Sequence, residues 1–167
     1  TVLHLCQAYT AIFNDGTMVR PYVIDSIVDS DTGKVEKKYK KKAVGTPISS
    51  TTAKEVQELM SHVTDDGASG ARFKVGGVDL LMKTGTGQIY NTDLGKYDSD
   101  YHTSSIMAAA PANDPKIMVY YGLVSQNITS YSAEPFKKIV RDTLQTCGIS
   151  TTPTNDTQES YEAWESY

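Results

Sequence analysis

One short segment, Lys83-Thr84-Gly85-Thr86-Gly87, brings together a cation, two hydroxyls and two glycines. A lysine supplies positive charge for an anionic ligand, and a threonine hydroxyl can donate a hydrogen bond to a carboxylate. Glycine leaves no side chain between the backbone and a ligand beside it. The backbone N–H that follows can stabilise a developing oxyanion, which in known enzymes is worth roughly 3–4 kcal/mol per donor. The segment therefore predicts a site that anchors a carboxylate alongside a strand.

The other residues that could do chemistry form no recognisable centre. The histidines, His4, His62 and His102, are widely spaced and do not fit a Ser-His-acid triad. Cys6 and Cys147 fit no metal-binding spacing, and we interpret them as buried free thiols, with a disulfide between them as the alternative. We therefore expect no metal and no cofactor.

The charge of the chain excludes one class of partner. The net charge of the 167 residues is -4, and no overall basic excess points to nucleic acid. One basic cluster stands out, and base rates favour the solvated end of a hairpin. The alternative is an anionic surface partner, such as membrane headgroups or wall polymer. The cluster comprises Lys37, Lys38, Lys40, Lys41 and Lys42.

The first part of the chain predicts two helices and a hairpin. Thr1 can cap a helix that runs to about Phe13. Residues 22–28 and 34–39 read as two strands around a turn at 29–33. A second helix begins near 50–52, where Thr52 and Glu55 fit a capping box. Its predicted apolar stripe contains Val56, Leu59, Met60 and Val63.

The segment with the glycine motif predicts an antiparallel sheet. Residues 78–90, 103–110 and 116–125 read as strands, and the last two are joined by a short turn, so they should pair antiparallel. A helix over 132–147 follows, with Phe136, Ile139, Val140, Thr143 and Leu144 on its apolar face. The polar composition of 150–167 indicates a mostly disordered tail. The fold class is therefore α+β.

Four stretches, taken together and in this order, resemble the class B penicillin-binding proteins, the D,D-transpeptidases that cross-link peptidoglycan. Lys-Thr-Gly is one of three motifs of penicillin-recognising serine enzymes, besides a Ser-x-x-Lys nucleophile motif and a Ser-Asp-Asn motif. The resemblance covers about 1–148. The stretches are 5–16 with Arg20-Pro21, the loop Gly67-Ala68-Ser69-Gly70, the motif and its continuation at 82–88, and the strand pair at 105–119.

The resemblance implies a role for each residue of the motif. Lys83 would line the cleft and maintain its electrostatics and proton relay. Thr84 and Thr86 would hydrogen-bond the carboxylate of a bound peptide or β-lactam, and the Thr86 backbone N–H would form half of an oxyanion hole. Gly85 would give clearance for the acyl group.

Two further residues, Gly87 and Gln88, would continue the strand along which the substrate lies. The family often has alanine where Gly87 stands, and we expect this departure to have a small effect.

The motifs that would complete the site are not in this sequence. No Ser-x-x-Lys occurs in the 167 residues. Ser125-Gln126-Asn127 has the spacing of Ser-x-Asn, but it follows the glycine motif instead of preceding it, and we interpret it as a turn. We therefore expect the nucleophile, its lysine base and the middle motif to lie upstream of Thr1 in the same protein. The isolated chain should be inactive.

The resemblance also implies an architecture, ligands and a location. Residues 1–149 would form the C-terminal part of a transpeptidase domain, with three strands of its central sheet backed by the C-terminal helix. The ligands would be peptidoglycan stem peptides and β-lactam antibiotics, at the extracytoplasmic face of the bacterial cell membrane, through an anchor that this chain does not contain.

Two other interpretations stay open. A class D β-lactamase or β-lactam sensor also carries Lys-Thr-Gly-Thr-Gly, but an aromatic, glycine-rich strand typically follows in those proteins. A non-catalytic penicillin-binding-like module would be favoured if the full-length protein lacked Ser-x-x-Lys.

Overall fold

The structure, a computed structural model, describes residues 1–126 and 132–151. The chain divides into two compact units, Thr1–Gln57 and Glu58–Tyr167, and the division falls inside helix α2 (Ser50–Ser61). Among the described residues, no helix is long and apolar enough to span a membrane. The predicted tail at 150–167 lies almost wholly outside the described residues, so that prediction and the boundary at 149 stay predictions.

The first unit opens with α1 (Val2–Phe13), as predicted. The Thr1 hydroxyl accepts a hydrogen bond from the His4 N–H and caps the helix. The helix ends where the Gly16 N–H, at a positive φ of 86°, donates to the Ala11 carbonyl. A side chain at Gly16 would also collide with the Ile48 carbonyl, so only glycine fits this turn.

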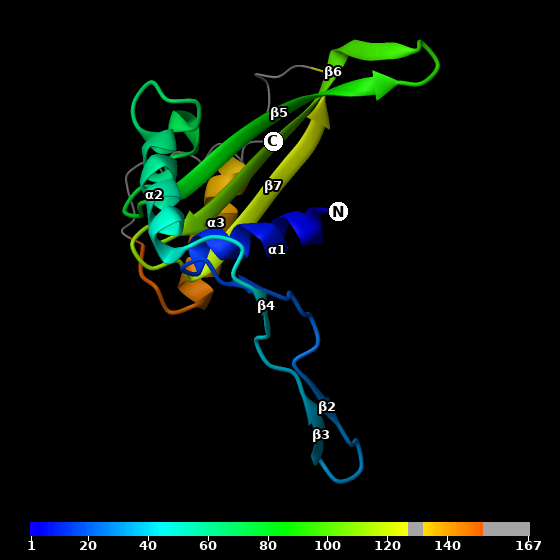
Figure 1. Ribbon diagram of the computed structural model, residues 1–167, viewed down its shortest axis with the longest axis vertical. Coiled ribbons are helices and arrows are strands. Elements are labelled where there is room, and N and C mark those ends of the chain that lie inside the picture. The colour runs from blue at the N-terminus through cyan, green and yellow to red at the C-terminus, as the bar shows by residue number, and fades with distance from the viewer. Residues whose placement is uncertain (127–131, 152–167) are drawn as a thin grey trace, which may run out of the picture. The chain divides into compact units, whose positions relative to one another are not determined.

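Two small antiparallel ribbons follow in the first unit. Strand β1 (Met18–Val19) pairs with β4 (Ala43–Gly45), and β2 (Ser26–Val28) pairs with β3 (Val35–Lys38) (Figure 1). The predicted strand over 22–28 is wrong in its first half, because β3 ends at Lys38 and leaves residues 22–25 without a strand to pair with. The β1–β4 pair was not predicted at all, since such short strands leave no periodic pattern.

The cap of α2 differs from the prediction. The Ser49 hydroxyl accepts a hydrogen bond from the Thr52 N–H at 3.0 Å, so Ser49 is the capping residue. The predicted capping box of Thr52 and Glu55 is wrong, because both residues lie inside the helix. Leu59 is also exposed, although the apolar stripe predicted it to be buried.

The second unit is built on a three-stranded sheet, which confirms the predicted α+β class. Strands β5 (Leu81–Asn91), β6 (Lys96–Ala110) and β7 (Ile117–Ser125) lie in this order, and both pairs are antiparallel. Strand β6 begins well before the predicted residue 103. Its first residues are polar and show no apolar alternation, and their pairing with β5 forms a long hairpin (Figure 1).

The core of the second unit lies between this sheet and helix α3 (Glu134–Thr146). Phe136 is completely buried and contacts the ring of Phe73, from the short 3-10 helix Ala71–Phe73, with the centroids 5.6 Å apart. A second 3-10 helix, His62–Thr64, follows α2. The remaining buried residues of this core include Val75, Leu80, Met82, Ile106, Ala108, Ala110, Ile117, Val140 and Leu144.

Two predictions for this helix are corrected. Ile139 is 43% exposed, because the buried face of α3 is narrower than the predicted stripe. Cys147 is exposed rather than buried, because it lies just after the last helical residue, and Cys6 is only partly buried.

The packing of α3 on the sheet generates a stability prediction. Replacing Phe136 by alanine removes a fully buried ring, and we expect the free energy of unfolding to fall by about 3–5 kcal/mol. The matched control is Ile139→Ala on the same helix, which should cost below about 1 kcal/mol. Urea unfolding followed by circular dichroism measures both. Equal losses for the two variants would contradict this description of the core.

Candidate active site

The glycine motif lies on an edge strand. Strand β5 is the first strand of the order β5-β6-β7, so within the described residues only one of its two sides is paired. Residues 83–88 all have partners on β6, from Lys83 opposite Met107 to Gln88 opposite His102. The motif is therefore held straight by β6 while its other side is open to a ligand.

A hydrogen bond of Lys83 indicates which backbone groups of β5 face its open edge. Its ammonium donates a hydrogen bond to the carbonyl of Thr84. We assign this carbonyl to the open edge, because the lysine reaches it there without competing with the β6 ladder. In an antiparallel strand, alternate residues direct their backbone groups to the same side. The Thr86 N–H and carbonyl therefore point to the open edge as well.

The two glycines of the motif differ in their surroundings. A side chain at Gly85 would begin 2.8 Å from the hydroxyl of Ser105, its partner on β6. A side chain at Gly87 would meet nothing within 4 Å. A side chain at 85 would therefore require the Ser105 hydroxyl to move, whereas position 87 has room for a methyl group.

Ser69 lies beside the motif, although the sequence predicts no role for it. Its hydroxyl lies 3.0 Å from the hydroxyl of Thr84. The loop can approach β5 because Gly70 has no side chain, since one there would begin 2.8 Å from both the Met82 sulfur and the Val63 carbonyl oxygen. The small residues of 67–70 were the only signal in the sequence, and they did not identify the partner.

Beyond the motif, the β5–β6 hairpin carries exposed tyrosines and carboxylates. Tyr90 and Tyr97 stack edge to face, with centroids 5.5 Å apart. The Asp98 carboxylate accepts hydrogen bonds from the Asp100 and Tyr101 N–H groups and from the Asn91 amide. These bonds, the backbone ones above all, hold the pKa of Asp98 below its ordinary value.

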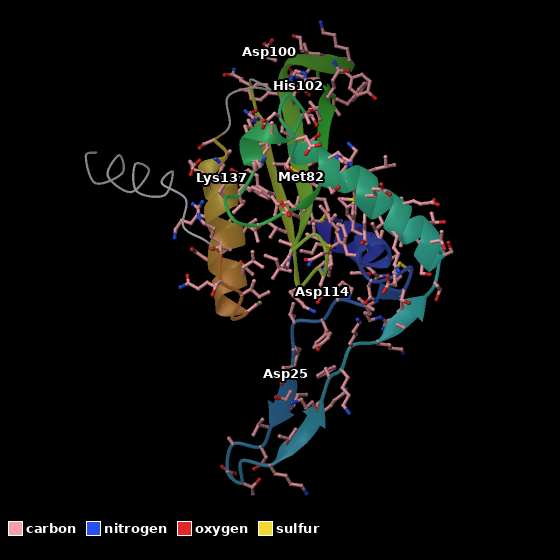
Figure 2. All side chains as sticks on the ribbon, turned by 90° about the vertical axis from the view of Figure 1, so that its left-hand side faces the viewer. Asp25, Met82, Asp100, His102, Asp114 and Lys137 are labelled. Carbon is pink, nitrogen blue, oxygen red and sulfur yellow. The ribbon has the colours of Figure 1, made fainter. Side chains whose placement is uncertain are left out.

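Two polar atoms near the motif lack partners among the described residues. They are the Nδ1 atom of His102 and the hydroxyl of Ser104, which is 1% exposed and pairs in register with Thr86. His102 lies in the hairpin close to Asp100 (Figure 2). Neither residue was assigned a function from the sequence.

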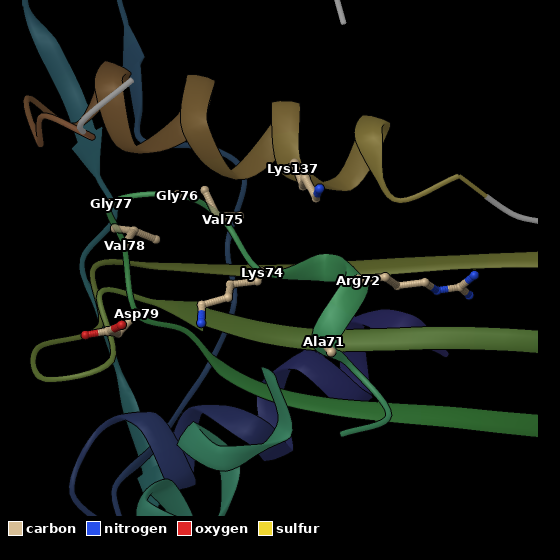
Figure 3. A pocket seen from close by; sticks show the side chains of 9 residues that line it. All are labelled: Ala71, Arg72, Lys74, Val75, Gly76, Gly77, Val78, Asp79 and Lys137. Carbon is tan, nitrogen blue, oxygen red and sulfur yellow. The ribbon is translucent and has the colours of Figure 1, made fainter. Parts of the chain in front are cut away.

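A separate cavity of about 640 Å³ lies between the 71–79 loop and α3. Figure 3 shows Lys137 projecting from α3 toward it, with Lys74 and Asp79 on the loop. None of residues 83–88 lines this cavity. It is therefore not part of the β5 site.

The chemistry available at the β5 edge is binding and polarisation. Lys83 supplies a cation, Thr84 and Thr86 supply hydroxyls, and the Thr86 N–H is an available donor. Among the described residues no group of three or more His, Cys, Asp or Glu could hold a metal ion. A reaction that forms a covalent intermediate needs a nucleophile with an adjacent base.

The comparisons with known proteins all point to one family. Residues 1–145 match the model of the penicillin binding protein transpeptidase domain. The probable peptidoglycan D,D-transpeptidase PenA of Neisseria gonorrhoeae is 31% identical over 157 residues, which is 91% of this chain and 25% of that protein. Stage V sporulation protein D of Bacillus subtilis is 30% identical over 154 residues, which is 89% of this chain and 23% of that protein.

Solved structures agree with the sequence relatives. Penicillin binding protein 3 of Mycobacterium tuberculosis, in a crystal structure with aztreonam, matches 92% of this chain and 36% of its own with a TM-score of 0.75 and 26% identity. This chain spans about a quarter of the length of the curated relatives described above.

The contact of Ser69 with Thr84 predicts a measurable change in side-chain order. In Ser69→Ala the Thr84 hydroxyl loses its 3.0 Å partner, so we expect its χ1 angle to average over several rotamers. Three-bond NMR couplings of Thr84 report this. Ser49→Ala, which removes a helix cap elsewhere, should leave those couplings unchanged. An unchanged Thr84 in Ser69→Ala would refute the contact.

The lowered pKa of Asp98 predicts that the stability of the β5–β6 hairpin depends on pH. Because its folded pKa is lowered, its stabilising effect is present above the ordinary value of 3.8 and is lost as the pH falls through the lowered pKa. We expect a carboxyl carbon NMR titration of Asp98 to have its midpoint below 3.8, and Asn91→Ala to raise it. A midpoint at or above 3.8 in the unmodified chain would contradict these hydrogen bonds.

Proposed function

Because the chain belongs to the penicillin-binding protein transpeptidase family, we propose that it provides the substrate-binding edge of a serine-type peptidoglycan D,D-transpeptidase. The observation that carries the proposal is the position of the motif on the edge strand. Lys83 lies at the Thr84 carbonyl, and the Thr86 N–H faces the same open side. This combination suits a ligand that carries both a carboxylate and a reactive carbonyl.

The proposed substrate is a peptidoglycan stem peptide that lies along β5. The hydroxyls of Thr84 and Thr86 bind its terminal carboxylate, and Ser69 orients the Thr84 hydroxyl for this role. Gly85 leaves room for the acyl group, and its β6 partner Ser105 already fills the space behind it. Gly87 and Gln88 extend the strand beside the rest of the peptide.

The reaction proceeds through a serine ester. The serine hydroxyl attacks the carbonyl of the penultimate residue, and the negative charge that develops on the carbonyl oxygen is stabilised by the Thr86 N–H. The bond to the terminal residue breaks, and that residue leaves as an amine after taking up a proton. The amine of a second stem peptide then attacks the ester and forms the cross-link. Lys83 maintains positive charge in the cleft and takes part in the proton relay.

The serine and its base come from outside the 167 residues. The sequence contains no Ser-x-x-Lys, so we propose that a further part of the same protein brings this motif and Ser-x-Asn to the open edge of β5. We place the assembled protein at the extracytoplasmic face of the bacterial cell membrane, where peptidoglycan is available.

β-Lactam antibiotics are the second proposed ligand class. They present a carboxylate or its equivalent next to a strained carbonyl, which is the same pair of groups that the stem peptide presents. The structure of the M. tuberculosis relative with aztreonam supports this extension.

A labelling experiment tests the proposed function. We expect the 167-residue chain alone to form no covalent adduct with a fluorescent penicillin in denaturing electrophoresis. Together with the part that carries Ser-x-x-Lys and Ser-x-Asn, the label should appear, on that other part, and Lys83→Ala should suppress it. A labelled band at the size of this chain would refute the assignment.

A pair of variants isolates the oxyanion donor in the assembled protein. Thr86→Val removes the hydroxyl and keeps the N–H, whereas Thr86→Pro removes both. Proline is tolerated on an edge strand when the missing N–H faces outward, so the sheet should survive. We expect acylation by Thr86→Pro to be about 10²–10³ slower than by Thr86→Val. Equal acylation rates would show that this N–H is not the donor.

A further inference from the structure

The β2–β3 ribbon and the residues that lead into and out of it form an arm, residues 22–42, that the proposed function does not use. Every residue of β2 and β3 is exposed except the partly buried Ser26, and Tyr39, just after β3, is also partly buried. Two backbone bonds close its base, from the Arg20 N–H to the Lys42 carbonyl and from the Tyr39 N–H to the Asp25 carbonyl. Residues 20–25 and 39–42 therefore lie side by side.

The arm exposes large aliphatic side chains to solvent. Val23 is 94% exposed and Ile24 is 53% exposed. Contiguous exposed apolar residues rimmed by charges mark surfaces that bind proteins or membranes. The other members of this group are Ile27, Val28 and Val35.

The charge of the arm is opposite to that of the chain. It holds six lysines and four carboxylates, a net charge of +2, whereas the whole chain has a net charge of -4. The lysines are concentrated next to Val23 and Ile24, because 37–42 contains five lysines and no acidic residue. Clusters of four to eight lysines or arginines are typical of segments that bind anionic lipid.

Two of the four acidic residues of the arm, Asp29 and Asp31, lie in its turn, whereas Asp25 lies in the flank with the Lys38 ammonium 4.0 Å away. The Asp29 carboxylate accepts bonds from the Thr32 hydroxyl and from the Thr32 and Asp31 N–H groups. These bonds, first that of the Thr32 side chain, lower the pKa of Asp29 and keep it ionised. The turn is therefore unsuited to enter an anionic surface, whereas the flank with Val23, Ile24 and the lysines is suited to lie on one.

We propose that the flank of the arm, residues 22–28 and 37–42, binds an anionic phospholipid surface. The aliphatic side chains enter the headgroup boundary, and the lysines pair with the phosphates around them. Lipid is favoured over an anionic wall polymer because a polymer of phosphates offers nothing apolar to Val23 and Ile24. The binding is independent of the β5 site.

Vesicle co-sedimentation tests the proposal on the full 167-residue chain. Vesicles with about 30% phosphatidylglycerol in phosphatidylcholine should bind the chain, and vesicles of phosphatidylcholine alone should bind it much more weakly. The triple variant K37Q/K40Q/K42Q should lose about fivefold per lysine, on the order of a hundredfold in all. The matched control K54Q/K74Q/K96Q removes the same charge from exposed lysines elsewhere and should lose far less.

The aliphatic part is tested separately. Val23→Ser with Ile24→Ser should weaken binding several-fold, whereas Leu59→Ser with Leu94→Ser, at similarly exposed positions, should not. In a chain with Val23→Trp and Trp164→Phe, lipids brominated on their acyl chains should quench the tryptophan. Circular dichroism of each variant checks that it is folded.

Three outcomes would overturn the proposal. The first is no binding to the anionic vesicles. The second is an equal loss for the two triple variants, which would reduce the effect to net charge. The third is binding of a soluble polyglycerol phosphate as tight as binding of the vesicles, with no quenching at position 23, which would identify a wall polymer as the partner.

Discussion

The pairing of β5 with β6 is the constraint on which the candidate site depends. Ten residue pairs join these strands, and they include every residue of 83–88. The ladder holds the motif extended, so that alternate backbone groups face the open edge and alternate side chains face opposite sides of the sheet. The buried ring of Phe136, whose centroid lies 6.1 Å from that of Tyr121 on β7, in turn holds α3 against that sheet. The position of the motif therefore depends on a core that contains none of residues 83–88.

Much of this arrangement could be predicted from the sequence where the pattern was periodic. The three strands of the sheet, the capping of α1 by Thr1 and the helix that contains Phe136 all followed from apolar spacing or turn residues. The predictions failed where pairing depends on a distant partner. The first residues of β6 are polar and become a strand only because β5 extends beside them. Ser49 replaces Thr52 as the cap because the helix already begins at Ser50.

Some residues of the candidate site could be identified from the sequence, and others could not. Lys83 and the threonines could be identified because their types are unusual together, and their roles still rest on the resemblance. Ser69 could not be identified, because its contact with Thr84 joins a loop to a strand 15 residues away. The exposed Val23 and Ile24 of the arm were also missed, since residues 22–28 read as one strand, whereas these two residues lie before the start of β2.

Gly85 and Gly87 look interchangeable in the sequence, yet the structure predicts that they tolerate substitution differently. Position 87 is open, so substitutions there can accumulate one at a time. Position 85 shares its space with the Ser105 hydroxyl, so a larger residue there displaces that hydroxyl and is favoured by a smaller residue at 105 on the neighbouring strand. Related domains should therefore accept a small residue at position 87 by itself, and a residue larger than glycine at position 85 together with a change at position 105.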